Sequence, residues 1–218
     1  MSTEREKRAA AEAAALLVED GMTVGLGTGT TVRYLLPALA RRGLDIRCVA
    51  TSDRTASAAN QLGLAVEPFD ALDALDALDI AVDGADQIAP DGWLIKGGGG
   101  AHTREKIVAG AAARFVVIAD STKPTFALHP PVPVELLRFG HRATLRELGT
   151  VTVRAGAPPS PDGGIIGDYL APFDDSGELA ARLSATPGVI GHGLFSPDLV
   201  SVILVGHGSR VEKRTLRT

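Results

Sequence analysis

The sequence predicts an α/β protein with a mostly parallel sheet in its main domain and a second, smaller α+β lobe. Short apolar runs alternate with helix-like segments from residue 22 to residue 119, which favours parallel strands covered by helices on both faces. The pattern changes at the proline-rich segment 129–133, where regular structure is expected to break. We therefore expect residues 1–130 plus about 203–218 to form the main domain and about 131–202 to form the small lobe.

The individual elements follow from apolar periodicity and from glycine or proline breaks. In the main domain we expect helices at 4–19, 31–42, 53–62 and 103–113, and strands at 22–26, 46–50, 64–67, 79–82, 93–95 and 115–119. Beyond the prolines we expect helices at 141–148 and 177–185, and strands at 151–154, around Ile165 and at 199–205. The last strand either closes the small lobe or returns to the main sheet. The three-residue repeat at 70–79 predicts a short solvated helical turn, and the basic tail 210–217 predicts a frayed end.

Composition restricts the class of protein. Of the 218 residues, 45% are hydrophobic and 22% are charged, with a net charge of -4 and no basic stripe, so no nucleic-acid partner is expected. No apolar stretch reaches the roughly 18 residues that a membrane span needs, so no membrane partner is expected either. Cys48 is the single cysteine and lies in an apolar run, which predicts a buried thiol. With no signal-peptide pattern, we expect a cytoplasmic protein.

A glycine-rich segment follows the first expected strand. Its residues Gly27, Thr28, Gly29, Thr30 and Thr31 offer backbone N–H groups, hydroxyls and the positive end of the next helix, which together suit a phosphate. The segment is not a Walker loop, and it lacks the third glycine of a dinucleotide fingerprint. An ordinary strand-to-helix turn is the alternative.

Two further clusters stand where strands are expected to end, which is where ligands bind in parallel α/β sheets. Asp83 and Asp86 flank Gly84 and Ala85; such paired carboxylates can bind hydroxyls, hold a lysine or relay protons, or form an Asx turn with a helix cap. Lys96 precedes four consecutive glycines, which suits close backbone approach to a ligand and charge neutralisation at an oxyanion.

Two more side chains complete the predicted site. Glu105 falls in the first turn of an expected helix, where the dipole stabilises the ionised carboxylate and makes it a candidate general base; simple helix stabilisation is the alternative. Lys123 follows the strand at 115–119 as a candidate phosphate contact or a plain surface lysine. The five histidines show no ligand spacing, so no metal site is expected. No cofactor is expected either.

Taken together, the segments 27–31, 83–86, 96–107 and 120–123 resemble the signatures of the ribose-5-phosphate isomerase A family, in its order and at its spacings. Pro187-Gly188-Val189-Ile190 and Gly193-Leu194-Phe195 resemble a later family segment. The resemblance implies a Rossmann-like main domain and metal-free interconversion of ribose 5-phosphate and ribulose 5-phosphate through a cis-enediolate, in a homodimer or homotetramer. It implies that Glu105 is the proton acceptor and that Asp83, Asp86 and Lys96 share in catalysis. It implies substrate binding by Thr28, Gly29, Thr30, Thr31, Asp83, Gly84, Ala85, Asp86, Lys96, Gly97, Gly98, Gly99 and Lys123.

The sequence departs from the family pattern at two places and leaves other functions open. Gln87 stands where the family commonly has Glu, and Pro161-Asp162-Gly163-Gly164 replaces a motif of Asp-Asn-Gly-Asn type. The alternatives are a non-enzymatic sugar-phosphate sensor, a nucleotide-dependent oxidoreductase and an acyl-transfer enzyme with a Glu nucleophile. An attached DNA-reading module, nicotinamide binding and a trapped thioester, respectively, would favour each of them.

Overall fold

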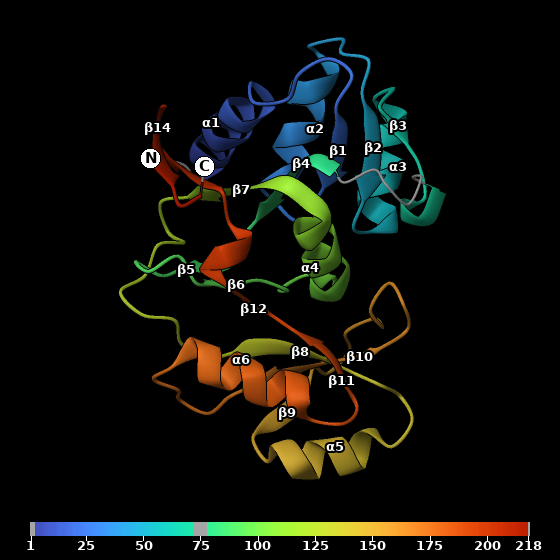
Figure 1. The fold of residues 1–218 in the computed structure, drawn as a ribbon, viewed down its shortest axis with the longest axis vertical. Helices are drawn as coiled ribbons and strands as arrows, with labels where there is room; N and C mark the ends of the chain where they lie inside the picture. The colour runs from blue at the N-terminus through green and yellow to red at the C-terminus, as the bar shows by residue number, and fades with distance from the viewer. Residues whose placement is uncertain (1–2, 72–77, 218) are drawn as a thin grey trace. The chain divides into compact units, whose positions relative to one another are not determined.

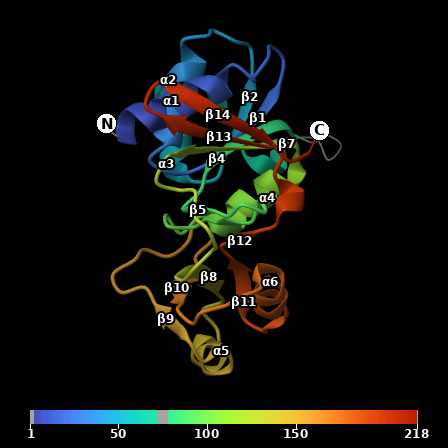
Figure 2. The same ribbon diagram turned by 90° about the vertical axis from the view of Figure 1, so that its left-hand side faces the viewer.

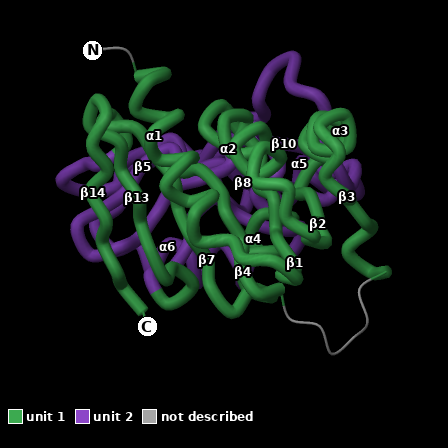
Figure 3. Tube along the Cα trace, turned by 90° about the horizontal axis from the view of Figure 1, so that it is seen from above, with its two compact units in different colours: residues 1–85, 104–123, 198–218 green, residues 86–103, 124–197 purple. Residues whose placement is uncertain are grey.

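The computed structural model describes residues 3–71 and 78–217 and confirms the α/β class. The chain divides into two compact units, coloured separately in Figure 3. Unit 1 comprises Met1–Ala85, Arg104–Lys123 and Asp198–Thr218; unit 2 comprises Asp86–Thr103 and Pro124–Pro197. Residues 86–103, expected in the main domain, group with unit 2, where their two strands pair within one sheet.

Unit 1 is built on a seven-stranded sheet (Figure 1). Its order is β14 (Arg210–Thr215), β13 (Val202–His207), β7 (Ala112–Asp120), β4 (Leu78–Gly84), β1 (Thr23–Leu26), β2 (Arg47–Ala50) and β3 (Ala65–Val66). All neighbours are parallel except β14, which pairs antiparallel with β13 at the edge seen in Figure 2. The mostly parallel sheet expected from the sequence is therefore confirmed.

Helices cover both faces of this sheet. On one face α1 (Thr3–Ala15), α2 (Val32–Ala40) and α3 (Asp53–Gln61) pack their apolar sides onto the strands. On the other face lies α4 (His102–Ala111): a Cβ added to Gly25 of β1 would stand 2.5 Å from Cγ1 of Val108. Because side chains alternate along a strand, Gly25 points away from the face that its neighbours Val24 and Leu26 share with α1 to α3. The missing side chain lets α4 approach closely.

The strand order fixes where a ligand can bind in unit 1. The chain runs outward from β1 to β2 and β3, and then returns to place β4 on the opposite side of β1. This reversal is a topological switch point, and the carboxyl ends of the strands beside it form the usual binding position of open α/β sheets. The loop after β1 and the end of β4 therefore carry the candidate site in unit 1.

Unit 2 contains two small sheets. The larger is antiparallel, in the order β11 (Val189–His192), β8 (Val132–Leu136), β10 (Ile165–Tyr169) and β9 (Val151–Val153). The helix α6 (Ser176–Ala185) contributes Leu179 and Leu183 to the core beneath it, and α5 (His141–Leu148) contributes Leu148. The smaller sheet has the order β12 (Leu194–Phe195), β6 (Leu94–Ile95) and β5 (Gln87–Ile88).

Three strands in the second half of the chain, β13, β14 and β8, bear on the expectations from the sequence. The strand expected at 199–205 returns to the main sheet, where β13 lies beside β7. The tail 210–217 was wrongly expected to fray, because β14 forms an edge strand there. The proline-rich segment was wrongly expected to lack regular structure: β8 runs through Pro133, whose carbonyl accepts a hydrogen bond from Gly193 N at 2.7 Å.

The remaining expectations concern single features. Most of the repeat at 70–79 lies outside the described residues; its first two residues belong to the short 3-10 helix η1 (Phe69–Ala71), and its last two begin β4. Cys48 is buried as expected, and burial raises the pKa of its thiol to about 12. Within residues 3–71 and 78–217, no helix is long and apolar enough to cross a membrane.

Candidate active site

The loop after β1 ends at a helix N-terminus that no side chain caps. The helix α2 begins at Val32, and the Thr31 side chain before it makes no capping hydrogen bond. Gly29 has a φ of 147°, a conformation that residues with a Cβ rarely adopt. The first N–H groups of a helix lack partners within the helix and attract anions. This geometry is compatible with an anion at the loop, and anion binding there stays a prediction.

The Thr28 side chain, a predicted substrate contact, belongs to a cluster of hydroxyl groups. Its Oγ1 lies 2.8 Å from both Thr51 Oγ1 and Ser52 Oγ, and 3.3 Å from Thr55 Oγ1. Thr55 Oγ1 in turn donates to the Gly27 carbonyl at 3.0 Å. This hydroxyl cluster ties the loop to the start of α3, so the Thr28 hydroxyl serves to fix the loop. Thr30, by contrast, is exposed.

Asp83 lies near the end of β4, beside the topological switch point. Its side chain is buried, and Oδ1 accepts hydrogen bonds from Thr28 N at 3.1 Å and Gly84 N at 2.7 Å. A Cβ on Gly27 would lie 2.0 Å from Cγ of Asp83. The carboxylate therefore occupies the space that glycine leaves at position 27, and this explains why the loop opens with glycine.

Lys7 joins this part of unit 1 although no local sequence signal marks it. Its Nζ donates to Thr30 Oγ1 at 3.1 Å and lies 3.7 Å from Asp120 Oδ2. The preceding residue anchors the helix: Glu6 accepts from Ser121 Oγ at 2.7 Å and from Ser121 N and Gly208 N, both at 3.1 Å. These hydrogen bonds, that from the Ser121 hydroxyl first, lower the pKa of Glu6. They hold α1 so that an ammonium stands at the loop.

Glu105 lies in the first turn of α4 and is only 3% exposed. The start of this helix is held within unit 2, where Thr103 Oγ1 donates to the buried Glu135 carboxylate at 2.5 Å. A carboxylate in the first turn is stabilised in its ionised form by the helix dipole. Lys123, the other candidate of unit 1, is half-buried just after β7.

Lys106 is the neighbour of Glu105 on α4, and burial lowers the pKa of its ammonium to about 7. An unfolded lysine loses its proton only near pH 10.4, so between these values the unfolded chain binds more protons, and the free energy of unfolding rises with pH. Lys106→Met removes this group. The free energy of unfolding of the variant minus that of the wild type is expected to fall as pH rises, by at most about 1.4 kcal/mol per pH unit between pH 7 and 9. Denaturant titrations at several pH values measure this difference, and one that stays constant with pH would contradict the assignment.

In unit 2, Asp86 holds the glycine run that follows Lys96. Its Oδ2 accepts from Gly98 N at 2.8 Å, and its own N donates to the Ile95 carbonyl at 2.8 Å. Gly97 has a φ of 101°, and a Cβ there would lie 2.7 Å from Nδ1 of the fully buried His102. The glycines thus allow a tight turn directly over a buried ring.

Lys96 itself is only 2% exposed. Its Nζ lies 5.3 Å from the centroid of the Phe195 ring, a distance that permits a cation–π interaction. Its backbone N donates to the Gly193 carbonyl at 2.8 Å. Burial and the ring contact restrict the ammonium near the end of β6; that it stabilises charge on a substrate stays a prediction.

Arg154 supports the same turn and was not found from the sequence. Its Nη1 donates to the Gly98 carbonyl at 3.0 Å, while Nε and Nη2 donate to the two Asp168 oxygens at 2.9 and 2.6 Å. The hydrogen bonds to Asp168 are the main cause of a raised pKa for Arg154. Gly98 is therefore held on both its N–H and its C=O, by residues far apart in the sequence.

Gln87, the first departure from the family pattern, also has a visible role. Its Nε2 donates to the His129 carbonyl at 2.8 Å, and its Oε1 accepts from His129 N at 2.9 Å. A glutamate could accept the second hydrogen bond but could not donate the first. The amide therefore fastens the segment before β8 within unit 2.

Each unit thus brings together part of the predicted set. Unit 1 joins the loop 27–31 with Asp83, and unit 2 joins Asp86 with the run from Lys96 to Gly99. That all these groups serve one substrate stays a prediction. Within the described ranges, 3–71 and 78–217, no three His, Cys, Asp or Glu side chains form a group that could hold a metal ion.

The fold and the site define a class: α/β proteins that bind an anionic small molecule at the carboxyl ends of parallel strands, with buried acidic groups beside it. A family model described as "Ribose 5-phosphate isomerase A (phosphoriboisomerase A)" matches residues 47–210. The chain belongs to this ribose 5-phosphate isomerase A family.

Individual relatives support this over nearly the full length. The chain is 47% identical over 221 residues to ribose-5-phosphate isomerase A of Caulobacter vibrioides (strain NA1000 / CB15N), covering 94% of this chain and 96% of that one. It is similar to the solved ribose 5-phosphate isomerase A of Methanocaldococcus jannaschii, with 34% identity and a TM-score of 0.90 over 98% of this chain and 100% of that one. A D-ribose-5-phosphate isomerase solved with phospho-erythronic acid gives a TM-score of 0.91 at 34% identity, covering 99% and 100% of the two chains.

Proposed function

We propose that this chain interconverts D-ribose 5-phosphate and D-ribulose 5-phosphate. The observation that carries the proposal is the match to this family over 94% of a chain that has the glycine-rich loop 27–31, the two aspartates, Lys96 and a buried Glu105. The relative solved with phospho-erythronic acid binds a phosphorylated acid, which supports a phosphorylated sugar as the ligand here.

The phosphate of the substrate binds at the loop 27–31. Backbone N–H groups at the uncapped start of α2 donate to the phosphate oxygens, and the Thr30 and Thr31 hydroxyls add donors. Lys7, 3.1 Å from Thr30 Oγ1, adds a positive charge. Lys123 is a further phosphate contact. The remaining predicted binding residues, including Gly84, Ala85 and Gly97 to Gly99, bring backbone close to the sugar.

The reaction moves one proton between neighbouring carbons. Asp83 or Asp86 moves a hydroxyl proton as the furanose ring opens to the aldehyde. Glu105 takes the proton from C2, which gives a cis-enediolate, and returns it to C1, while the hydroxyl proton on O2 passes to O1, which gives the ketose. Lys96 stabilises the negative charge that develops on the oxygens. Atoms and charge balance, because substrate and product are isomers and Glu105 ends ionised again.

The test is direct. Purified, chelator-treated protein is mixed with ribose 5-phosphate, and ketose formation is followed by absorbance. Steady production of ribulose 5-phosphate until equilibrium is expected. If no ketose forms with correctly folded protein, the proposal is wrong. We also propose that the protein is cytoplasmic and forms a homodimer or homotetramer; sedimentation of the purified protein measures the assembly.

A further inference from the structure

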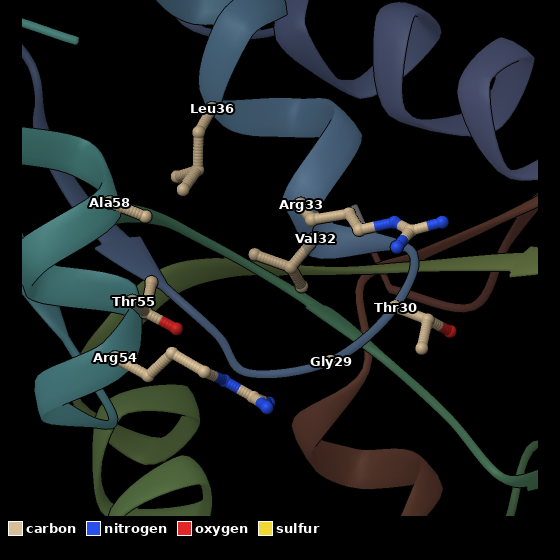
Figure 4. A pocket seen from close by; sticks show the side chains of 8 residues that line it. All are labelled: Gly29, Thr30, Val32, Arg33, Leu36, Arg54, Thr55 and Ala58. Carbon is tan, nitrogen blue, oxygen red and sulfur yellow. The ribbon is translucent and has the colours of Figure 1, made fainter. Parts of the chain in front are cut away.

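A cavity of about 230 Å³ lies in unit 1 beside the candidate phosphate loop. It is lined by the loop itself, by the first turns of α2 and α3, and by apolar side chains that include Val32, Leu36 and Ala58 (Figure 4). Gly29 and Thr30 of the phosphate loop belong to its lining. An anion at the start of α2 would therefore border this cavity.

Two arginines line the cavity, and their surroundings differ. Arg33 Nη2 donates to Glu4 Oε1 at 2.5 Å and to the Tyr34 hydroxyl at 3.0 Å, so its guanidinium is already engaged. Arg54, in the first turn of α3, makes no hydrogen bond or ion pair in the part of the chain that the structure describes. Figure 4 shows its side chain extended from α3 toward the loop at Gly29.

The electrostatics around Arg54 favour an anion. A cation in the first turn of a helix is opposed by the helix dipole, and the N-terminus of α2 adds a second positive end at the same loop. The adjacent Asp53 is 99% exposed and pairs weakly with Arg104 at 3.8 Å. Lys7 contributes a further positive charge at Thr30. These charges leave an unmatched positive potential beside the loop.

We propose that Arg54 is a specificity-determining residue that binds the phosphate group of the substrate from the α3 side, an inference that rests on the proposed function. Guanidinium groups form strong, often bidentate hydrogen bonds with phosphate oxygens. The apolar lining provided by Val32, Leu36 and Ala58 lowers the local dielectric constant, which strengthens this attraction. The same lining has no hydrogen bonds to offer the sugar hydroxyls, so the phosphate end is the part of the substrate that suits this position.

The experiment compares Arg54→Ala with the matched control Arg33→Ala. Arg54→Ala is expected to raise the KM for ribose 5-phosphate about tenfold or more, with kcat within about twofold of wild type, because a charge-assisted contact is lost in both ground and transition states. Competitive inhibition by inorganic phosphate should weaken by a similar factor. Arg33→Ala removes the same charge from the same cavity and should change both constants less than about twofold. An intermediate effect of Arg54→Lys would indicate that charge is kept while the bidentate geometry is lost.

The outcomes separate this inference from the proposed function. If the wild type isomerises ribose 5-phosphate but Arg54→Ala keeps its KM and its inhibition by phosphate, the role of Arg54 is wrong and the enzyme activity stands. If the wild type shows no isomerase activity, titration of inorganic phosphate by calorimetry still decides: weaker binding to Arg54→Ala than to Arg33→Ala supports the anion site, and equal binding overturns it.

Discussion

Replacing Glu105 by Gln is expected to lower kcat by at least about a hundredfold while KM changes little. Glutamine has the same size and can keep the same position in the first turn of α4, where the side chain is 3% exposed. It cannot accept a proton from C2 of the sugar. The loss should therefore fall on the chemical step, since the phosphate contacts at the loop 27–31 are unchanged.

Initial rates of ketose formation across a range of ribose 5-phosphate concentrations measure both constants. Ile107→Gln is the matched control, because it changes an apolar side chain, 53% exposed, on the same helix to glutamine. That control should keep near-normal turnover and a circular dichroism spectrum equal to that of Glu105→Gln. Near-normal turnover in Glu105→Gln would show that another group is the base.

The elements of unit 1 could be predicted because each short apolar run is bounded by glycine or by a helix pattern. The prediction failed at β8 because proline was read only as a breaker. Pro133 is tolerated in this strand because no backbone N–H is needed at its position. The pairing of β11 with β8 ends at His192 and Val134, and Pro133 only accepts a hydrogen bond, from Gly193 N. The fraying expected for the tail was wrong because β14 is an edge strand in which only Val211 and Arg214 are partly buried, so its sequence shows no alternation of polar and apolar residues.

Some residues of the candidate site are marked by the sequence around them, whereas others reach it only through the fold. The loop 27–31 and the run after Lys96 can be recognised in the sequence by their clustered glycines, because glycine itself permits the backbone conformations found there. Lys7 and Arg154 do not, because each reaches its partner from another element: Lys7 from α1 to Thr30, and Arg154 from the end of β9 to Gly98. Nothing beside either residue in the sequence signals that contact. Such supporting cations require the fold to be known.

Gly193→Ala is expected to lower the free energy of unfolding by at least about 2 kcal/mol and to reduce turnover as well. A Cβ at position 193 would lie 2.2 Å from the carbonyl oxygen of Lys96 and 2.9 Å from Cδ of Pro133. Neither neighbour can rotate away, because the first is backbone and the second a proline ring. Gly193 also pairs through its own carbonyl with Lys96 N at 2.8 Å and through its N with the Pro133 carbonyl at 2.7 Å. The added methyl group must therefore displace the backbone that carries the Lys96 ammonium.

Denaturant unfolding of Gly193→Ala beside Gly110→Ala separates this clash from the general effect of replacing glycine. Gly110 lies within α4, and a Cβ there meets nothing within 4 Å, so alanine should raise the free energy of unfolding by about 0.5–1 kcal/mol through its higher helix propensity. Opposite signs for the two variants are the expected result. Equal stability of Gly193→Ala and wild type would mean that the strand at 194–195 can shift away from Lys96, and that the contact does not fix the ammonium. A folded Gly193→Ala with reduced kcat and unchanged KM would instead locate the damage at Lys96, because a misplaced ammonium stabilises the developing oxyanion less than it binds the ground state.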